Sequence, residues 1–526
     1  MNIATSKIGR GLILLCFLWG CENTNREELK FPIEEITIEE IHKGLRQGHF
    51  SVEELVQSYL DRIREIDQDG HQLRSVLHLN PDAIAIAQEL DMELMAGKDR
   101  GPLHGVPVLL KDNLNSGDKM PTTAGSRAME GSIASEDSFV AMRLREAGAV
   151  ILGKTNLSEW ANFRGELSSS GWSGLGGQTK NPYVLDRNPC GSSSGSGVAV
   201  SANLTVLAIG TETNGSIVCP SHANGIVGIK PTVGLISRSG VIPISYTQDT
   251  PGPMARTVRD AAICLGVIAG MDEKDNKTMD EDAVFHTDYT QFLNVDGLNG
   301  KRIGWYNTSE GRNFKVDTLM RQAVSFMEKA GATVVPISSI EAPGTGEHSF
   351  QVMLFEYQDG LNRYFESLGD GANIKSLSDL IAFNVKDEVS LRFHNQKYLE
   401  LALKKGDLTH KDYLNALNNM IKGSREEGID QVMKENELDA IIAPTGSPAW
   451  KTDLVNGDSF QLGSSSPAAH AGYPNITVPM GMVEALPVGI SFFGKAWSEP
   501  KLLEIAYAYE QGTKHRSKPT FLPTLE

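Results

Sequence analysis

The sequence predicts an α/β fold in which a mixed central β-sheet is covered by helices on both faces. Between about residues 103 and 259, short apolar runs punctuated by glycine, which are typical of buried strands, alternate with segments of helical periodicity. The chain has 526 residues, of which 40% are apolar, so it is long enough to bury one large core. We therefore expect a single large domain over residues 35–520.

Two helices are predicted at the start of this domain. Thr37 with Glu40, and Ser51 with Glu54, have the spacing of capping boxes, in which a hydroxyl and a carboxylate bind the first free N–H groups of a helix. Apolar residues then recur at helical spacing between positions 52 and 66, which gives one apolar stripe. These helices are expected to pack on the outside of the core.

Buried strands are predicted wherever a short apolar run lies between glycine-rich or polar segments. The first four such runs are residues 106–110, 149–152, 204–209 and 226–229. A helix is predicted over residues 138–147, and the alternation of the two kinds of element favours a mixed sheet.

The second half of the chain differs in composition and periodicity. The segment from about 270 to 435 is more polar and helical, and we predict that it forms an insertion that shapes a substrate cleft. Two later apolar runs, 440–443 and 488–493, are expected to return to the main sheet.

The first residues have the pattern of a secretory signal. Lys7 and Arg10 precede an apolar stretch over residues 11–19. This stretch is too short to span a bilayer as a helix. An exported protein is therefore expected.

The end of this stretch predicts a lipid anchor. Residues 18–21 resemble a bacterial lipobox, so residues 1–21 would be a lipoprotein-type signal peptide and Cys21 the lipidated first residue. Residues 22–34 are polar and would tether the domain to a bacterial membrane, facing the periplasm or the cell surface. An uncleaved anchor, or a plain secretory signal with an incidental cysteine, remains an alternative.

The charge argues against nucleic acid as a partner. The net charge of −17 and the pI of about 5.3 would repel phosphate backbones, and no cluster of Lys and Arg is interleaved with aromatic residues. The sequence contains no HExxH or similar ligand spacing, so we also expect no metal.

Three cysteines follow the predicted signal peptide: Cys190, Cys219 and Cys264. They form no CxxC pair, and their odd number argues against a disulfide framework. We therefore predict three buried thiols.

Residues 189–197 form a run of Gly and Ser that allows several interpretations. Such runs are most often linkers or loops. A phosphate-binding loop is excluded, because no Lys-Ser or Lys-Thr pair follows the glycines. Residues 191–195 match the G-x-S-x-G elbow of α/β-hydrolases, which would make Ser193 the nucleophile and require a later histidine such as His470. Spacing alone leaves that alternative open.

The order of several motifs resembles the amidase-signature family. Lys111 lies in the segment 103–113, Ser192 lies in the Gly/Ser run, and Ser216 follows Ser192 by 24 positions, which matches the family's spacing. Further motifs follow in the family's order at residues 228–232, 249–256, 471–481 and 486–489. The resemblance covers about residues 35–515.

This resemblance implies the amidase-signature fold and a cofactor-free hydrolase of carboxamide bonds. Its catalytic triad would be Lys111, Ser192 and Ser216. Ser216 would attack the amide carbonyl, Ser192 would accept the proton of Ser216, and Lys111 would be the final base. Lys111 can do so only when it is neutral, which requires burial. Because this relay needs no histidine, the following residues are expected to be structural: His104, Lys154, His222 and His470.

The resemblance also implies an oxyanion hole made of backbone N–H groups. The donors would be those of Thr213, Asn214, Gly215 and Ser216, in a turn that glycine makes possible. The chain departs from many relatives here, because Cys190-Gly191 and Asn214-Gly215 stand where those relatives have Gly-Gly.

Within the family, residues 152–165, 177–183 and 190–194 most resemble bacterial peptide amidases, which remove the C-terminal carboxamide of peptides. Two other functions remain open. The first is that of the glutaminase component of a glutamyl-tRNA amidotransferase, which releases ammonia from glutamine, although the export signal argues against a cytoplasmic tRNA substrate. The second is a surface lipoprotein that binds a ligand without catalysis.

Overall fold

The computed structural model describes residue 1, residues 33–369 and residues 372–526. The predicted signal peptide, the lipidated Cys21 and most of the predicted tether therefore lie outside the described residues. Within the described part of the chain, no helix is both long enough and apolar enough to cross a membrane.

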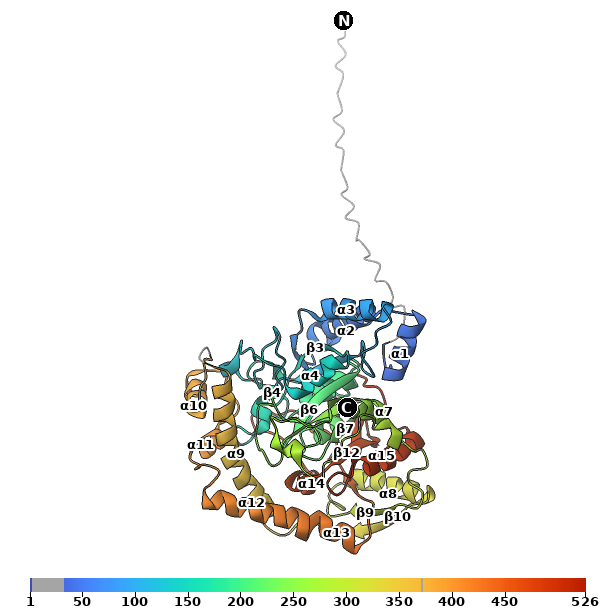
Figure 1. The fold of residues 1–526 in the computed structure, drawn as a ribbon, viewed down its shortest axis with the longest axis vertical. Coiled ribbons are helices and arrows are strands. Elements are labelled where there is room, and N and C mark those ends of the chain that lie inside the picture. Colours follow the sequence, from blue (N-terminus) through green and yellow to red (C-terminus); the bar gives the residue numbers. More distant parts are fainter. Residues whose placement is uncertain (2–32, 370–371) are drawn as a thin grey trace.

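A mixed sheet of 11 strands runs through the middle of the molecule (Figure 1). In spatial order its strands are β1 (Val76–Leu79), β3 (Val150–Thr155), β2 (Pro107–Lys111), β6 (Leu207–Glu212), β8 (Thr250–Ala255), β7 (Val227–Lys230), β12 (Asn475–Val483), β13 (Leu486–Phe493), β11 (Ala440–Pro444), β9 (Arg302–Tyr306) and β10 (Thr333–Ile337). β2 is parallel to β3 and β6, whereas β8 is antiparallel to β6 and β7. The predicted α/β fold with a mixed sheet is confirmed.

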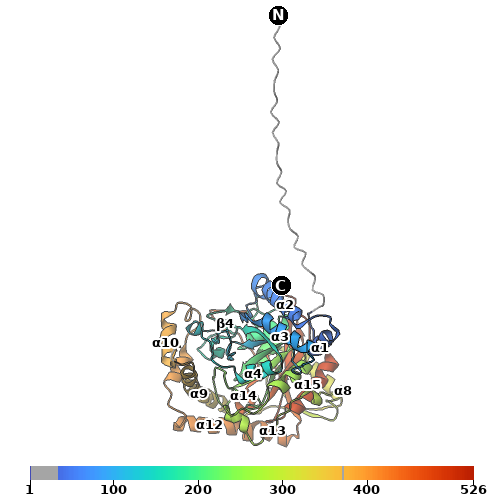
Figure 2. The ribbon, with the colours of Figure 1, turned by 45° about the horizontal axis from the view of Figure 1, so that its top comes forward.

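Helices pack around this sheet, as Figures 1 and 2 show. They are α1 (Ile38–Gln47), α2 (Val52–Arg62), α3 (Ala83–Met95), α4 (Phe139–Glu146), α5 (Ser194–Ser201), α6 (Val218–Ala223), α7 (Val258–Ile268), α8 (Phe314–Lys329), α9 (Thr345–Ser367), α10 (Leu377–Lys386), α11 (Lys397–Leu403), α12 (Lys411–Ser424), α13 (Asp430–Glu435), α14 (Ser466–Ala471) and α15 (Glu499–Thr513). α1, α2 and α3 lie together at the end of the molecule where residue 33 enters, and α9 to α13 line the opposite rim.

The two predicted capping boxes are confirmed. The Thr37 hydroxyl accepts a hydrogen bond from the Glu40 N–H, and the Glu40 carboxylate accepts one from the Thr37 N–H. Ser51 and Glu54 exchange the same two bonds at the start of α2. These caps satisfy N–H groups that a helix leaves free at its first turn. In the apolar stripe of α2, Val52, Leu55, Val56 and Tyr59 are fully buried and Leu60 is partly buried, which fixes the helix against the core.

Five strands of the sheet were not expected from the sequence: β1, β8, β9, β10 and β12. β8 contains Pro251 and Pro253, which argue against a central strand because proline donates no ladder hydrogen bond, yet β8 pairs on both sides. β12 overlaps the motif at residues 471–481, which was not predicted to be a strand. β9 and β10 lie inside the segment 270–435, so the prediction that this segment is a helical insertion was incomplete. The segment 270–435 also extends the sheet, because its strand β9 pairs in parallel with β11.

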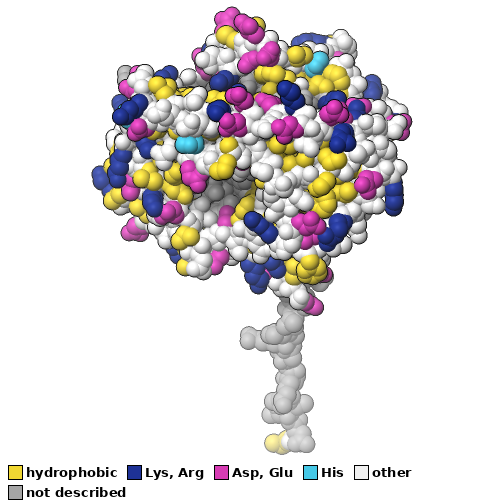
Figure 3. Space-filling model, turned by 90° about the horizontal axis from the view of Figure 1, so that it is seen from below, with side chains coloured by type: hydrophobic (Ala, Val, Ile, Leu, Met, Phe, Trp, Pro, Cys, Tyr) yellow, Lys and Arg dark blue, Asp and Glu magenta, His cyan; other side chains and the backbone are white. Residues whose placement is uncertain are grey.

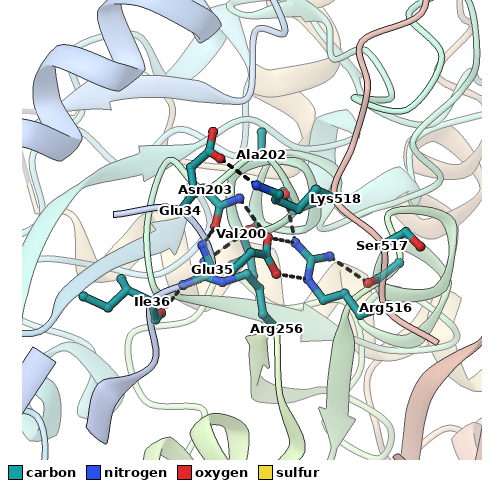
Figure 4. A network of polar contacts seen from close by, with 12 residues as sticks. Glu34, Glu35, Ile36, Val200, Ala202, Asn203, Arg256, Arg516, Ser517 and Lys518 are labelled. Atoms are coloured by element: carbon teal, nitrogen blue, oxygen red, sulfur yellow. Dashed lines mark hydrogen bonds and ion pairs between the residues drawn. The ribbon is translucent and has the colours of Figure 1, made fainter. Parts of the chain in front are cut away.

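The first described residues are held against the C-terminal segment by a network that we call the terminal clamp, made of Glu34, Glu35, Asn203, Arg516 and Lys518 (Figure 4). The Glu35 carboxylate accepts hydrogen bonds from Arg516 at 2.7 and 2.8 Å and from Asn203 at 2.9 Å. Lys518 donates to Glu34 at 2.9 Å. The clamp joins three segments that are far apart in sequence, because Asn203 follows α5.

Candidate active site

Lys111 is the last residue of β2, and its side chain is fully buried. β2 and β6 are parallel neighbours with Leu110 opposite Ile209, so the ends of both strands meet at one point of the sheet. There the Lys111 Nζ donates hydrogen bonds to Ser192 Oγ at 2.8 Å, to Thr211 Oγ1 at 2.8 Å and to the Thr211 carbonyl at 3.2 Å. The predicted contact between Lys111 and Ser192 is present.

The surroundings of Lys111 favour its neutral form. Burial lowers the pKa of Lys111 from 10.5 to about 7, and the negative charges of Asp249 and Glu212 oppose this shift only in part. A lysine with such a pKa is neutral in a large fraction of molecules near pH 7. Its lone pair can then accept the Ser192 O–H proton along the same 2.8 Å contact, so the pair can act as a base.

The loops that carry the two predicted catalytic serines are joined twice. The Ser193 N–H donates to the Ser216 carbonyl at 3.1 Å. A disulfide also joins Cys190, two residues before Ser192, to Cys219, three residues after Ser216. Each link keeps the Gly/Ser loop close to the segment that carries Ser216.

This disulfide corrects the prediction of three buried thiols. Of these three cysteines, only Cys264 is free, and it is fully buried in the core. An odd number of cysteines excludes complete pairing but does not exclude one pair, and the sequence separation of 29 gives no sign that the two loops meet. The sheet brings them together, with their Cα atoms 5.9 Å apart.

Ser216 has the exposure expected of a nucleophile. Its relative exposure is 9%, and its hydroxyl forms no hydrogen bond with any other described residue. Ser192 is 1% exposed and is engaged by Lys111. Ser216 is thus the more exposed of the two serines and Ser192 is the one that contacts Lys111, which fits the roles of nucleophile and proton carrier that the resemblance implies.

Two buried carboxylates that sequence reasoning missed shape the turn before Ser216. Glu212 accepts hydrogen bonds from the N–H groups of Gly215 at 2.7 Å, Ile217 at 2.8 Å and Val218 at 3.0 Å. Gly215 has a φ of +82°, a conformation that glycine adopts without strain. Glu212 thus holds the turn and the start of α6 together.

Asp249 is the second of these carboxylates. It accepts hydrogen bonds from the Thr213 hydroxyl at 2.6 Å and from two backbone N–H groups. Burial raises the pKa of Asp249 to about 6, and the Thr213 bond opposes that shift. Glu212 and Asp249 lie within the motifs at 210–217 and 249–256, so an acidic residue inside each motif was the signal that could have identified them.

The four predicted oxyanion donors differ in whether their N–H groups are already hydrogen-bonded. The Gly215 N–H already donates to Glu212. Among the described residues, no hydrogen-bond acceptor is found for the N–H groups of Thr213, Asn214 and Ser216. The oxyanion hole itself remains a prediction, and these three donors are the ones that a substrate oxygen could engage without breaking a bond.

The structure argues against Ser193 as the nucleophile of an α/β-hydrolase elbow. Ser193 is fully buried, donates to the Thr211 carbonyl at 3.1 Å and accepts from the Thr211 N–H at 3.2 Å. His470 is bound elsewhere, to Glu341 and Asn214. No histidine among the described residues hydrogen-bonds to Ser193, so the base that an elbow requires is missing.

Three other residues have the structural surroundings expected of them. Lys154 is fully buried, 3.5 Å from Asp112, and donates to the Thr122 hydroxyl at 2.8 Å. His104 is buried and bonded to backbone groups on both ring nitrogens. Burial lowers the pKa of His222 to about 3, so this histidine is neutral.

The surface is hollowed on the face seen in Figure 3, where acidic, basic and apolar side chains are interspersed. Across the described part of the chain, no three His, Cys, Asp or Glu residues cluster as a metal site would require. The polar groups around Lys111 are instead hydroxyls, backbone groups and single carboxylates, which suit proton transfer.

This geometry agrees with what comparison with known proteins finds. A family model described as Amidase matches residues 54–503. The chain belongs to the amidase signature family. A probable amidase of Arabidopsis thaliana is 40% identical over 505 residues, which are 94% of this chain and 93% of the relative.

Solved structures within the family are similar along the whole domain. The native peptide amidase of Stenotrophomonas maltophilia is 48% identical, with a TM-score of 0.89, and the match covers 93% of this chain and 99% of that one. Among curated relatives, a glutamyl-tRNA(Gln) amidotransferase component from Thermosynechococcus vestitus is 35% identical over 92% of this chain and 99% of its own. This amidase is thus an enzyme that hydrolyses amide C–N bonds.

Proposed function

We propose that this amidase removes the C-terminal carboxamide of peptides and releases ammonia through an acyl-enzyme on Ser216. The observation that carries the chemical part is the 2.8 Å contact of a fully buried Lys111 with Ser192. The substrate class is supported by the 48% identity to the S. maltophilia peptide amidase, which exceeds the 35% identity to the amidotransferase component.

The proposed reaction begins with attack of Ser216 Oγ on the carbonyl carbon of the amide. Ser192 takes the Ser216 proton and passes its own proton to neutral Lys111. Backbone N–H groups of the turn stabilise the oxyanion of the tetrahedral intermediate. The C–N bond then breaks as Lys111 returns the proton through Ser192 to the leaving nitrogen, which departs as ammonia.

Water completes the cycle. It attacks the ester on Ser216 while the neutral Lys111 again accepts a proton through Ser192. Breaking of the ester returns that proton to Ser216 and frees the peptide acid. One relay therefore serves as base and acid in both halves of the reaction, and no cofactor is needed for the electron balance.

The test is ammonia release by the chain from residue 22, supplied with C-terminally amidated peptides, free glutamine and simple aliphatic amides. We expect release from the amidated peptides, its loss in Ser216→Ala, and its retention in Ser193→Ala. Release from glutamine alone would favour the amidotransferase-like alternative. No release from any amide by the folded wild-type chain would refute the proposal.

We also propose that the protein is exported and held at a bacterial membrane by a lipid on Cys21. The pattern of residues 7–21 supports this, and so does the Cys190–Cys219 disulfide, because such bonds persist mainly in oxidising compartments. Metabolic labelling with a fatty-acid analogue tests it. Label on the wild type that is lost in Cys21→Ser is expected, and an unlabelled wild type would refute lipidation.

A further inference from the structure

The turn formed by residues 213–215 is anchored on three sides, and each anchor ends at a different carboxylate. Thr213 is bound by Asp249 and Gly215 by Glu212, and both acids lie in the sheet region beside the turn. The third anchor holds the side chain of Asn214 and comes from the far side of the site. It has no part in the proton relay between Lys111 and Ser216.

The amide of Asn214 is held in one orientation by its partners. Its Oδ1 accepts a hydrogen bond from Ser465 Oγ at 2.6 Å. Its Nδ2 donates to Ser466 Oγ at 3.2 Å and faces His470 Nε2 at 3.5 Å. Ser466 and His470 belong to α14, and Ser465 is the residue just before it. Each end of the amide thus meets a serine hydroxyl, and the nitrogen end also faces the His470 ring.

Glu341 determines which ring nitrogen of His470 carries the proton, and thereby whether Nε2 donates or accepts. The His470 Nδ1 lies 2.7 Å from Glu341 Oε1, and the two side chains are 7% and 20% exposed. A carboxylate only accepts, so Nδ1 carries the proton and donates. In the neutral ring Nε2 then has a lone pair directed at Asn214.

At 3.5 Å the contact between Asn214 Nδ2 and His470 Nε2 is a weak hydrogen bond, and its effect is on the orientation of the Asn214 amide. If the Asn214 amide were reversed, its oxygen would face the lone pair of His470 Nε2. The Ser465 and Ser466 hydroxyls can each donate or accept, so they fit either orientation of the amide. The repulsion between two lone pairs therefore makes the histidine the group that selects the orientation seen.

We propose that His470, fixed by Glu341, is a positioning residue that holds the Asn214 end of the turn and thereby the backbone N–H groups that precede Ser216. The inference rests on the proposed function, because it assigns those N–H groups to the oxyanion. Glu341 lies between β10 and α9, so this anchor links the segment 270–435 to the nucleophile turn.

The experiment compares His470→Leu, which removes both ring nitrogens, with His470→Gln, whose amide can accept from Asn214 and donate to Glu341. Each variant is assayed for kcat and KM on an amidated peptide. We expect His470→Leu to lower kcat by about tenfold to a hundredfold while KM stays within about twofold, since the lost contacts serve the transition state. His470→Gln should recover most of the loss.

A double-mutant cycle tests whether His470 acts through Asn214. Asn214→Ala should lower kcat to a similar extent, and adding His470→Leu to it should cost little more. Additive losses in the double variant would overturn the proposal. So would an unchanged kcat in His470→Leu, or equal losses in the Gln and Leu variants.

One control separates positioning from stability, and one further variant tests the anchor at Glu341. His104→Leu removes a buried histidine near α3, and it should lower the melting temperature without lowering kcat of the folded protein. Glu341→Ala removes the carboxylate that fixes His470 and should lower kcat by about threefold to tenfold.

A labelling assay makes the test independent of the substrate. The rate at which a fluorophosphonate labels Ser216 depends on the nucleophile and the oxyanion donors but not on peptide binding. It should fall in His470→Leu and recover in His470→Gln. If the wild type released no ammonia from amidated peptides, the proposed function would fail, while the labelling rates would still decide the role of His470.

Discussion

The active site is a buried network of polar side chains and the terminal clamp a partly exposed one, and their charges are balanced in opposite ways. In the clamp, burial raises the pKa of Glu35, but the hydrogen bonds and charge of Arg516 bring it below the ordinary value. In the active site, Lys111 has hydrogen bonds only to hydroxyl and carbonyl oxygens, and burial lowers its pKa to about 7.

The difference shows that burial and pairing together decide whether a charge serves stability or chemistry. A paired carboxylate keeps its charge and holds segments together. A buried lysine without a directly bonded acid loses part of its charge, which lowers stability but creates a base at neutral pH. The comparison can be tested with four sets of substitutions.

The largest effect is expected for Lys111→Met, which removes the base but keeps the volume of the side chain. Activity should fall by about a thousandfold or more. The folded chain should nevertheless become more stable at pH 7, by on the order of 1–4 kcal/mol, because the lysine pKa is lower in the folded than in the unfolded chain. Thermal unfolding and ammonia release measure the two effects.

The sign of the stability effect can be checked with pH. Between pH 7 and pH 10.5 the unfolded chain binds the Lys111 proton more than the folded chain does. Wild-type stability should therefore rise with pH in this window relative to Lys111→Met, and the gap between the two should close. A variant that is less stable than wild type at pH 7 would contradict this account of Lys111.

The second test breaks the covalent link between the serine loops. Replacing Cys190 and Cys219 by Ser should lower stability by about 2–4 kcal/mol, as removal of a disulfide typically does. It should also lower kcat by roughly tenfold, because misplacement of the serines by a fraction of an ångström slows the reaction.

Thiol counting checks the disulfide directly. The denatured chain from residue 22 should show one reactive thiol without reductant, from Cys264, and three after reduction. Three thiols without reductant in protein purified under oxidising conditions would mean that the link does not form.

The third test weakens the clamp. Arg516→Met leaves the partly buried Glu35 carboxylate without its main partner, so we expect a loss of about 1–2 kcal/mol and no change in kcat below the melting temperature. Glu34→Gln, which removes the exposed pair with Lys518 and the pair with Arg62, should change stability by less, under about 1 kcal/mol.

The pH dependence of this effect follows from the lowered pKa of Glu35. Its contribution is full above the ordinary pKa of 4.5 and is lost as pH falls through the lower folded value. The difference in melting temperature between wild type and Arg516→Met should therefore shrink below about pH 4.5. A change in kcat with unchanged stability would show that the clamp acts on the site.

A small shift in the pH profile is expected from a charge near Lys111, apart from any fall in kcat caused by weakening the Thr213 anchor. The negative charge of Asp249 raises the pKa of Lys111, so Asp249→Asn should lower that pKa further. The acidic limb of kcat/KM, expected near pH 7 in wild type, should move to lower pH by up to about one unit. A shift to higher pH would contradict the assignment of this limb to Lys111. Asp439→Asn, a change at a partly exposed carboxylate paired with Lys501, is the control.

Much of the fold was predictable where local chemistry decides structure. The capping boxes at Thr37 and Ser51 work through contacts within four residues, and the fully apolar runs of β2 and β6 have no alternative to burial. β8 was not predictable, because Pro251 and Pro253 argue against a strand, and only its two neighbours in the sheet stabilise it there.

For the site, the sequence by itself supplied the candidates for the chemistry: Lys111, Ser192 and Ser216 stand in motifs whose order and spacing identify the family. Only the tertiary structure decided the disulfide, the carboxylates that hold the turn and the contacts of His470. Those contacts join residues that are distant in sequence, and such contacts depend on which strands the sheet places side by side. Spacing along the chain does not specify that arrangement.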